Sequence, residues 1–238
     1  MGPRRLLIDT GEGKPSWSGL LSSVLTLEHT TISQALITHW HPDHIGGVKD
    51  LLSLCPEAKI SKHSPGAGQC PIDESQTFQS QGATLRAFHC PGHTTDHMAL
   101  ILEEENAMFT GDNVLGHGTA VFEDLTIYLS SLHRMREQFS GRAYPGHGPV
   151  IEDGKARIEE YIQHRQQREE EVLSVLRGAE DAKTPMQIVK VVYRDVPENL
   201  HEPAERGMVQ VLKKLEGEGK VVEVQDGERW RVAGKAAL

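Results

Sequence analysis

Four side chains that bind metal ions lie close together in one short stretch, as His39, His41, Asp43 and His44. Alternate residues of an extended segment point to the same side, so His39 and His41 can bind one ion together. Asp43 and His44 follow where the chain turns toward a helix, and they face a direction that suits a second ion. Imidazole nitrogen and carboxylate oxygen are both zinc ligands, and a site that keeps a position open for water is catalytic. The alternative is a cluster of surface histidines.

Three further donors each follow an apolar strand at a turn. They are His93 after Pro-Gly, Asp112 after Thr-Gly, and His147 after a second Pro-Gly. We expect His93 to complete one zinc site with His39 and His41. We expect His147 to complete a second zinc site with Asp43 and His44, and Asp112 to be shared between the two ions. A water held between two zinc ions would be deprotonated near neutral pH and would be a nucleophile.

Several residues near these donors have two interpretations. Asp9 ends an apolar strand and is either a turn residue or a group that orients the histidine loop. His97 either lies on a strand face, which we favour, or hydrogen-bonds near the site. Cys90 is close in sequence to His93, but we favour a free thiol over a zinc ligand. The glycine-rich loop 114–124, which contains His117, borders the expected substrate cleft.

Bulk composition limits the function classes. The chain has 238 residues and a net charge of −9, which argues against broad nucleic-acid binding through a positive surface. Residues 204–238 differ, because they hold 7 basic and 6 acidic side chains, a net charge of +1. No stretch approaches the roughly 20 apolar residues that span a bilayer. Three cysteines without a CxxC pair indicate free thiols in a reducing compartment.

Strands alternate with helices over the first part of the chain, which predicts an α/β sandwich with the donors along one edge. We expect helices at 18–29, 48–54 and 125–139, and strands that include 6–9, 34–38, 83–89, 98–102, 107–110 and 142–144. Glu103–Glu105 then form a solvated turn between two strands. A long helix follows at 153–176, and its His164, Arg165 and Arg168 are expected on a solvated face.

The pattern changes at Thr184, which with Pro185 predicts the start of a helix. A second helix at 203–216 and a hairpin of 220–224 with 229–232 complete the outline of a winged helix–turn–helix. The predicted domains are therefore 1–152 for the catalytic domain, 153–180 for a connecting helix and 181–238 for a winged-helix-like domain.

The full set of motifs resembles the metallo-β-lactamase superfamily: H-x-H-x-D-H at 39–44, P-G-H at 91–93, T-G-D at 110–112 and P-G-H-G at 145–148. The resemblance implies an αββα sandwich and assigns the seven donors as ligands of two Zn²⁺ ions, with Asp43 also a candidate for proton handling. Family members carry further strands before the position of Arg4. This chain lacks them, so we expect an exposed sheet edge.

The stretch 112–125 and the stretch 197–202 resemble more closely the beta-lactamase-like protein 2 family. That resemblance implies a mitochondrial matrix endoribonuclease with single-stranded RNA as its substrate. The lack of a long apolar stretch predicts no membrane partner. We therefore predict zinc-dependent hydrolysis of RNA phosphodiesters by a hydroxide that bridges the ions. The C-terminal cations that could contact phosphates are Lys213, Lys214, Lys220, Arg229 and Arg231, whose alternative is a solvated face of a packing domain.

Two other functions remain open from the sequence. One is a thioester hydrolase of the glyoxalase II kind, which uses a very similar site but whose C-terminal region is helical. The other is an inactive, nucleic-acid-binding relative. The metal site alone does not choose among them, because function depends on what surrounds the site.

Overall fold

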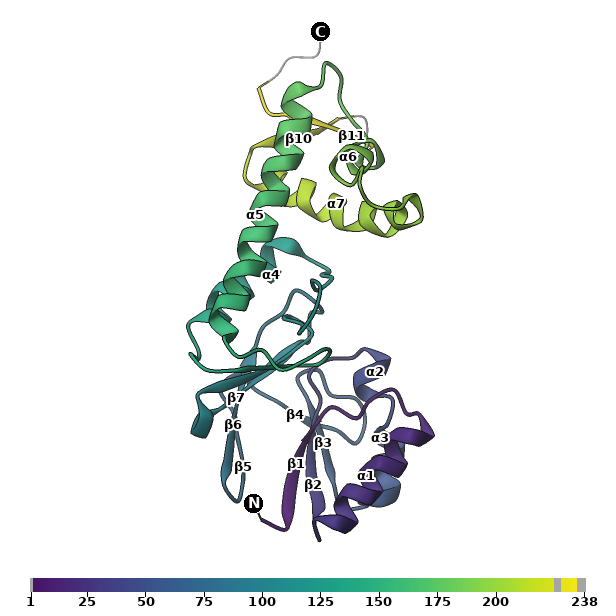
Figure 1. Cartoon of the computed structure of the whole chain (residues 1–238), viewed down its shortest axis with the longest axis vertical. Coiled ribbons are helices and arrows are strands. Elements are labelled where there is room, and N and C mark those ends of the chain that lie inside the picture. The colour runs from purple at the N-terminus through teal and green to yellow at the C-terminus, as the bar shows by residue number, and fades with distance from the viewer. Residues whose placement is uncertain (1, 225–227, 235–238) are drawn as a thin grey trace.

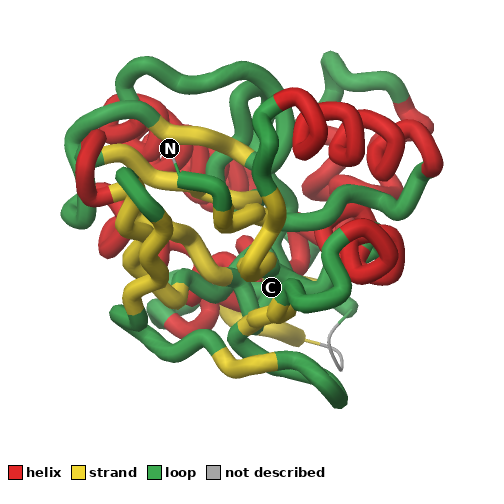
Figure 2. The backbone as a smooth tube through the Cα atoms, turned by 90° about the horizontal axis from the view of Figure 1, so that it is seen from below, coloured by secondary structure: helices red, strands yellow, loops and turns green. Residues whose placement is uncertain are grey.

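The structure is a computed structural model that describes residues 2–224 and 228–234. Two sheets face each other in the N-terminal part, and a long helix, α5 (Gly154–Gly178), extends from them to the C-terminal part (Figure 1). Strands gather at the centre of the N-terminal part and helices lie to the outside (Figure 2).

The first sheet is parallel and carries the histidine cluster at the end of one strand. The strand order is β1-β2-β3-β4. Helices α1 and α3 cover its outer face, where Trp17 and Leu21 pack with Ala35, Leu51 and Ile60. The elements are β1 (Arg4–Ile8), α1 (Pro15–Leu27), β2 (Thr31–Leu36), α3 (Val48–Leu54), β3 (Lys59–Lys62) and β4 (Cys70–Pro71). Among the described strands, β1 and β4 lie at the two edges of this sheet.

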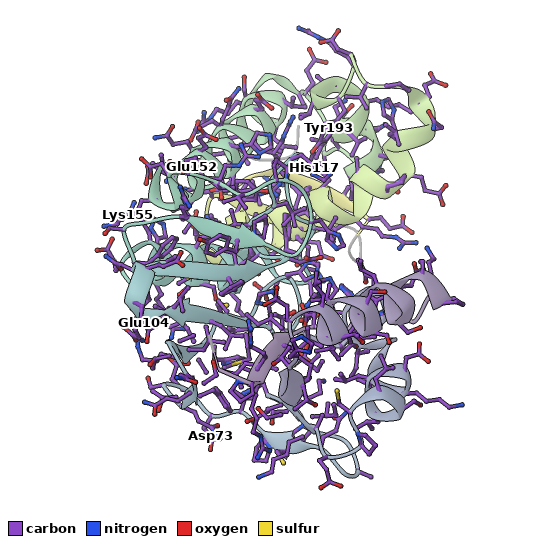
Figure 3. All side chains as sticks on the ribbon, turned by 60° about the horizontal axis from the view of Figure 1, so that its bottom comes forward. Asp73, Glu104, His117, Glu152, Lys155 and Tyr193 are labelled. Carbon is purple, nitrogen blue, oxygen red and sulfur yellow. The ribbon has the colours of Figure 1, made fainter. Side chains whose placement is uncertain are left out.

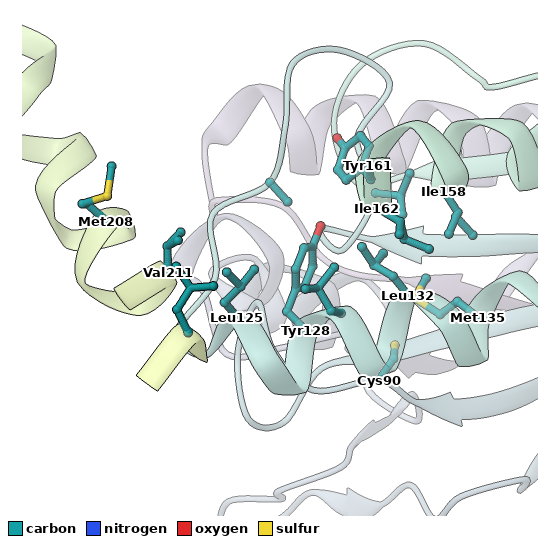
Figure 4. Packing of buried hydrophobic residues seen from close by; sticks show 14 of the residues in the cluster. Cys90, Leu125, Tyr128, Leu132, Met135, Ile158, Tyr161, Ile162, Met208 and Val211 are labelled. Atoms are coloured by element: carbon teal, nitrogen blue, oxygen red, sulfur yellow. The ribbon is translucent and has the colours of Figure 1, made fainter. Parts of the chain in front are cut away.

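The second sheet has the order β5-β6-β7-β8-β9 and is antiparallel except for the pair β8–β9. Its outer face is covered by α4 and the first half of α5, which meet through Leu132, Met135 and Ile158 (Figure 4). The elements are β5 (Thr77–Ser80), β6 (Ala83–His89), β7 (Met98–Leu102), β8 (Ala107–Gly111), α4 (Leu125–Arg136) and β9 (Ala143–Pro145).

Strand β7 shows why the two sheets stack. Successive side chains of a strand point to opposite faces. Met98 and Leu100 face the first sheet and pack in the core between the sheets, whereas Ala99 and Ile101 pack beneath α4 and α5. The predicted αββα sandwich is therefore confirmed.

The C-terminal part has the predicted helix–helix–hairpin order. Thr184 begins the first helix with a capping box, because its hydroxyl accepts from the Gln187 amide and its own amide donates to the Gln187 side chain. The elements are α6 (Pro185–Val192), η2 (Glu198–Leu200), α7 (His201–Gly217), β10 (Val221–Val224) and β11 (Arg229–Val232). The two strands pair antiparallel, and three residues of the predicted turn, 225–227, lie outside the described residues. The winged-helix outline is confirmed.

Some predicted boundaries were wrong by a few residues. Helix α1 begins at Pro15 rather than at residue 18, because proline is favoured at the first helical position. Strand β2 ends at Leu36, two residues before the predicted end. The acidic turn is a short 3₁₀ helix, η1 (Glu103–Glu105), and its Glu104 is labelled at the outer edge of the molecule in Figure 3. None of the described helices is long and apolar enough to cross a membrane.

Candidate metal centre

The seven predicted donors lie at the ends of strands from both sheets. The segment after β2 supplies His39 and His41, and the short helix α2 (Pro42–Ile45) supplies Asp43 and His44. The loop between β6 and β7 supplies His93, whereas Asp112 directly follows β8 and His147 follows β9. The fold thus brings together residues up to 108 positions apart in the sequence, from 39 to 147.

The first group of donors consists of three histidines and one aspartate. The donor atoms of His39, His41, His93 and Asp112 all lie within 4.8 Å of one another. His41 Nδ1 lies 2.9 Å from His39 Nε2 and 3.0 Å from His93 Nε2. Three imidazole nitrogens thus converge on one point, and their side chains come from both sheets.

The second group consists of Asp43, His44 and His147, whose donor atoms also lie within 4.8 Å of one another. His147 Nε2 lies 3.3 Å from His44 Nε2 and 3.1 Å from Asp43 Oδ2. His44 is buried, whereas the side chains of Asp43 and His147 are 45% and 42% exposed. This group therefore opens to solvent on one side.

Asp112 lies between the two groups. Its Oδ1 is 3.4 Å from His44 Nε2, and its Oδ2 is 3.4 Å from His147 Nε2 and 3.8 Å from His93 Nε2. Oδ1 is buried and has no hydrogen-bond partner among the described residues. A buried carboxylate oxygen costs free energy unless it is paired, hydrogen-bonded or bound to a metal.

The spacing of the donor atoms fits metal ions. Ligand atoms about 2.0–2.1 Å from a tetrahedral ion are about 3.3 Å from each other. The nitrogen pairs above are separated by 2.9–3.3 Å. Two unprotonated imidazole nitrogens repel each other at that distance unless a cation lies between them. Two groups of histidines and carboxylates, with one shared aspartate, can therefore hold metal ions.

Asp9 orients donors of both groups. His44 donates its Nδ1 proton to Asp9 Oδ2 over 2.7 Å, so its Nε2 lone pair faces the site. The same oxygen accepts from the Thr38 hydroxyl, which in turn accepts from His39 Nδ1 over 2.9 Å. The Thr38 amide donates to the other carboxylate oxygen over 2.7 Å. Of the two interpretations of Asp9, the structure supports the orienting one.

The electrostatics of the site favour a cation. Burial lowers the pKa of His44, but the carboxylates of Asp112 and Asp9 outweigh burial and raise this pKa to about 10. The carboxylates that stabilise a proton on His44 would equally stabilise a metal ion in its place. Burial lowers the pKa of His39 far below its usual value and also lowers the pKa of His93, so both stay neutral and able to ligate.

Of the two interpretations of His97, the structure supports a hydrogen bond near the site rather than the strand face that we favoured. His97 is fully buried, and its Nε2 accepts a hydrogen bond from the Asp112 amide over 3.0 Å. The His97 ring also explains Gly111, because a Cβ there would lie 2.5 Å from Nε2. No local signal reveals this contact, since the partner is a backbone amide 15 residues away.

Cys90 lies behind His97 and belongs to neither donor group. Burial raises the pKa of its thiol to about 12, which disfavours the thiolate that a metal ligand requires.

Comparison with known proteins identifies the two parts of the chain. The family described as "Metallo-beta-lactamase superfamily" matches residues 4–68, and "Beta-lactamase associated winged helix domain" matches residues 184–230. A beta-lactamase domain protein from Burkholderia ambifaria has the same fold, with a TM-score of 0.83 at 20% identity over 96% of this chain and 82% of that one.

Two fungal relatives are more similar in sequence. The "Lactamase-like protein ptaB" of Pestalotiopsis fici is 44% identical over 96% of this chain and 76% of that protein. The "Atrochrysone carboxyl ACP thioesterase" of Emericella nidulans is also 44% identical, with the same coverage. The chain belongs to the metallo-beta-lactamase superfamily and carries its associated winged helix domain, and it is a hydrolase.

The predicted zinc endoribonuclease is wrong, because several similar relatives are named as thioesterases. Likewise, the finer resemblance to the mitochondrial beta-lactamase-like protein 2 family is not supported by these relatives. The structure also shows the contacts of three of the five C-terminal cations expected to contact phosphates. Lys214, one of the cations expected to contact phosphates, is half-buried and pairs with Glu169 and Glu218. Lys220 pairs with Glu218, and Arg229 donates to the Ala182 carbonyl.

Proposed function

We propose that this chain is a metal-dependent thioesterase that hydrolyses the thioester between an acyl group and an acyl carrier protein. The observation that carries the proposal is its 44% identity, over 96% of its length, to an atrochrysone carboxyl ACP thioesterase. The reaction adds water to the thioester carbonyl, breaks the C–S bond, and yields a carboxylic acid and a free thiol.

The donor set supports zinc at both groups. We propose one Zn²⁺ held by His39, His41, His93 and Asp112, and a second held by Asp43, His44, His147 and the shared Asp112. When bound, such ions lower the pKa of water and stabilise the negative charge that develops on the thioester carbonyl oxygen.

Residues of the chain itself orient the metal ligands and handle the proton. Asp9 and Thr38 fix the tautomers of His44 and His39 through the hydrogen bonds described above. Asp43 is the most exposed carboxylate of the site, and it is within reach of solvent and of His147. We assign it to proton handling, which needs an accessible group near the reacting atoms.

Apolar side chains beside the donors support an apolar or aromatic acyl group. Trp40 is 49% exposed and lies edge-on to His41 at 4.5 Å, while Val121, next to His93, is 72% exposed. A cavity of about 420 Å³ adjoins the second group. Its lining includes Leu7, Ile8, Trp17, Phe109, Tyr144 and Val150.

The test compares three substrates with purified chain of known metal content. They are an aromatic acyl group on an acyl carrier protein, S-lactoylglutathione, and a labelled single-stranded RNA. We expect chelator-sensitive thiol release from the first and much slower release from the second, because a lactoyl group gains little from apolar surfaces. A sample without substrate corrects for the exposed Cys70 thiol. Rapid cleavage of S-lactoylglutathione, with none of the carrier thioester, would refute the proposed substrate class.

A further inference from the structure

The loop 115–123 borders the first donor group and is fastened to α5 by side chains on one face of that helix. Tyr161 donates its hydroxyl to the Gly118 carbonyl over 3.0 Å and accepts from the Leu115 amide over 3.1 Å. Arg157 donates to the same Gly118 carbonyl over 3.0 Å. Tyr161 projects from α5 beside Ile158 and Ile162, which pack against α4 (Figure 4). Hydrogen bonds from the well-packed helix α5 therefore hold the loop in place.

Arg165, one turn further along this face, makes the closest contact with the loop. Its guanidinium donates to the Ala120 carbonyl over 2.7 Å and lies 4.8 Å from the centre of the Phe122 ring. The residue is only 9% exposed, and no carboxylate pairs with it among the described residues. We had expected Arg165 on a solvated face, and the structure contradicts this. A buried cation held by one carbonyl and aromatic rings is costly, which favours a specific role over general stability.

The loop segment that Arg165 holds also contacts His93, a predicted metal ligand. Val121, directly after Ala120, accepts a hydrogen bond from His93 Nδ1 over 2.8 Å. This bond places the His93 proton on Nδ1 and leaves the Nε2 lone pair facing His41. Outer hydrogen bonds of this type set the tautomer and orientation of metal-binding histidines. His93 differs from His39 and His44, which are oriented through Asp9, because its partner is a loop carbonyl that needs external support.

We propose that Arg165 is a positioning residue for the first metal group: by holding Ala120 and Phe122 it places the Val121 carbonyl that orients His93. The chain of contacts runs from α5 through the loop to one ligand of one group. The second group, at Asp43, His44 and His147, meets the loop only at its start, where the Gly116 amide donates to the His147 carbonyl over 2.9 Å, four residues before the Ala120 that Arg165 holds. The inference rests on the proposed function only in that metal ions bind at the site, and it does not depend on which bond is cleaved.

The test is a Co²⁺ titration of the full chain, followed by the visible absorption of the bound ions. The variants are Arg165→Met, which keeps the bulk of the side chain, and Arg165→Lys, which keeps a donor. Arg168→Met is the matched control. Arg168 lies on the same helix with its guanidinium 4.2 Å from the Tyr193 ring, but it contacts the C-terminal part rather than the loop. Figure 3 labels Tyr193 in that part.

We expect Arg165→Met to lower the affinity for one of the two Co²⁺ ions about 10–100-fold and to alter the absorption spectrum of that ion. A change of this size is the usual effect of losing an outer hydrogen-bond partner. The other ion should bind as in the wild type. Arg165→Lys should recover part of the affinity, and Arg168→Met should titrate like the wild type.

Equal titrations for Arg165→Met and Arg168→Met would overturn the inference, as would equal weakening of both ions in Arg165→Met. The titration reads metal binding alone. A wild-type chain that binds two ions but releases no thiol from any carrier thioester would refute the proposed substrate, and it would leave the result for Arg165 intact.

Discussion

Replacing Asp9 with asparagine separates its orienting role from its place in the fold. Asp9 has a positive φ of 58°, a conformation that asparagine also tolerates. The variant keeps one acceptor oxygen for the Thr38 amide but presents an NH₂ group where His44 Nδ1 and the Thr38 hydroxyl now donate. That group stabilises the His44 tautomer with its proton on Nε2, which prevents this nitrogen from binding a metal.

The size of the effect follows from these contacts. Loss of an outer partner costs about 10–100-fold in metal affinity, or about 1.4–2.8 kcal/mol at 1.4 kcal/mol per tenfold change. The zinc affinity of the second group should fall more than that of the first, because Asp9 contacts His44 directly and His39 only through Thr38. Hydrogen bonds to a charged group contribute about 1.5–3 kcal/mol each, so unfolding in chelator should also become easier. A loss of about 2 kcal/mol lowers the Tm of a chain of this size by about 4–8 °C.

Zinc affinity would be measured by competition with a chromophoric chelator, and stability by thermal unfolding in EDTA. Asp153→Asn is the control, because Asp153 caps α5 by accepting from the Ala156 amide and asparagine caps equally well. If Asp9→Asn bound both zinc ions as tightly as Asp153→Asn does, the orienting role of Asp9 would be refuted.

Three further predictions concern single residues. Asp112→Asn should lower thiol release at least about a hundredfold with an unchanged circular dichroism spectrum, since the amide removes the charge between the groups; activity in metal-clean buffer would contradict this. Gly146→Ala should lower the bound metal per chain, because its Cβ would lie 2.4 Å from Asp112 Oδ1; Gly207→Ala, which meets nothing within 4 Å in helix α7, should bind metal normally. Lys214→Met should lower the free energy of unfolding in urea by about 2–4 kcal/mol by stranding the buried Glu169 carboxylate, and adding Glu169→Met should restore most of it.

The sequence predicted which seven side chains the fold brings together, because their pattern is local. Four of the seven lie within one short stretch, and the other three each follow a strand-ending turn. Strand ends of an α/β sandwich meet along one edge, so their convergence follows from the strand pattern alone. The layer order follows likewise from alternating strands such as β7.

The supporting residues were not predictable in the same way. His97 and Arg165 act through backbone groups of Asp112 and Ala120, and a backbone amide or carbonyl leaves no trace in the sequence. For Arg165, a polar residue on a long helix is ordinarily solvated, and only the tertiary packing of the loop buries it. The predicted substrate class was wrong for a related reason. The same kind of donor set can serve phosphodiester or thioester hydrolysis, and the surface around the site decides between them.

We propose that two metal-binding groups sharing Asp112 make this chain a thioesterase. The most direct test removes metal from the chain and then adds Zn²⁺ stepwise, while thiol release from an aromatic acyl carrier protein thioester is followed. We predict no release without metal and full activity once two equivalents have bound. Thiol release that survives complete removal of metal, or no release at two bound equivalents, would show that the two metal groups are not the centre of thioester hydrolysis.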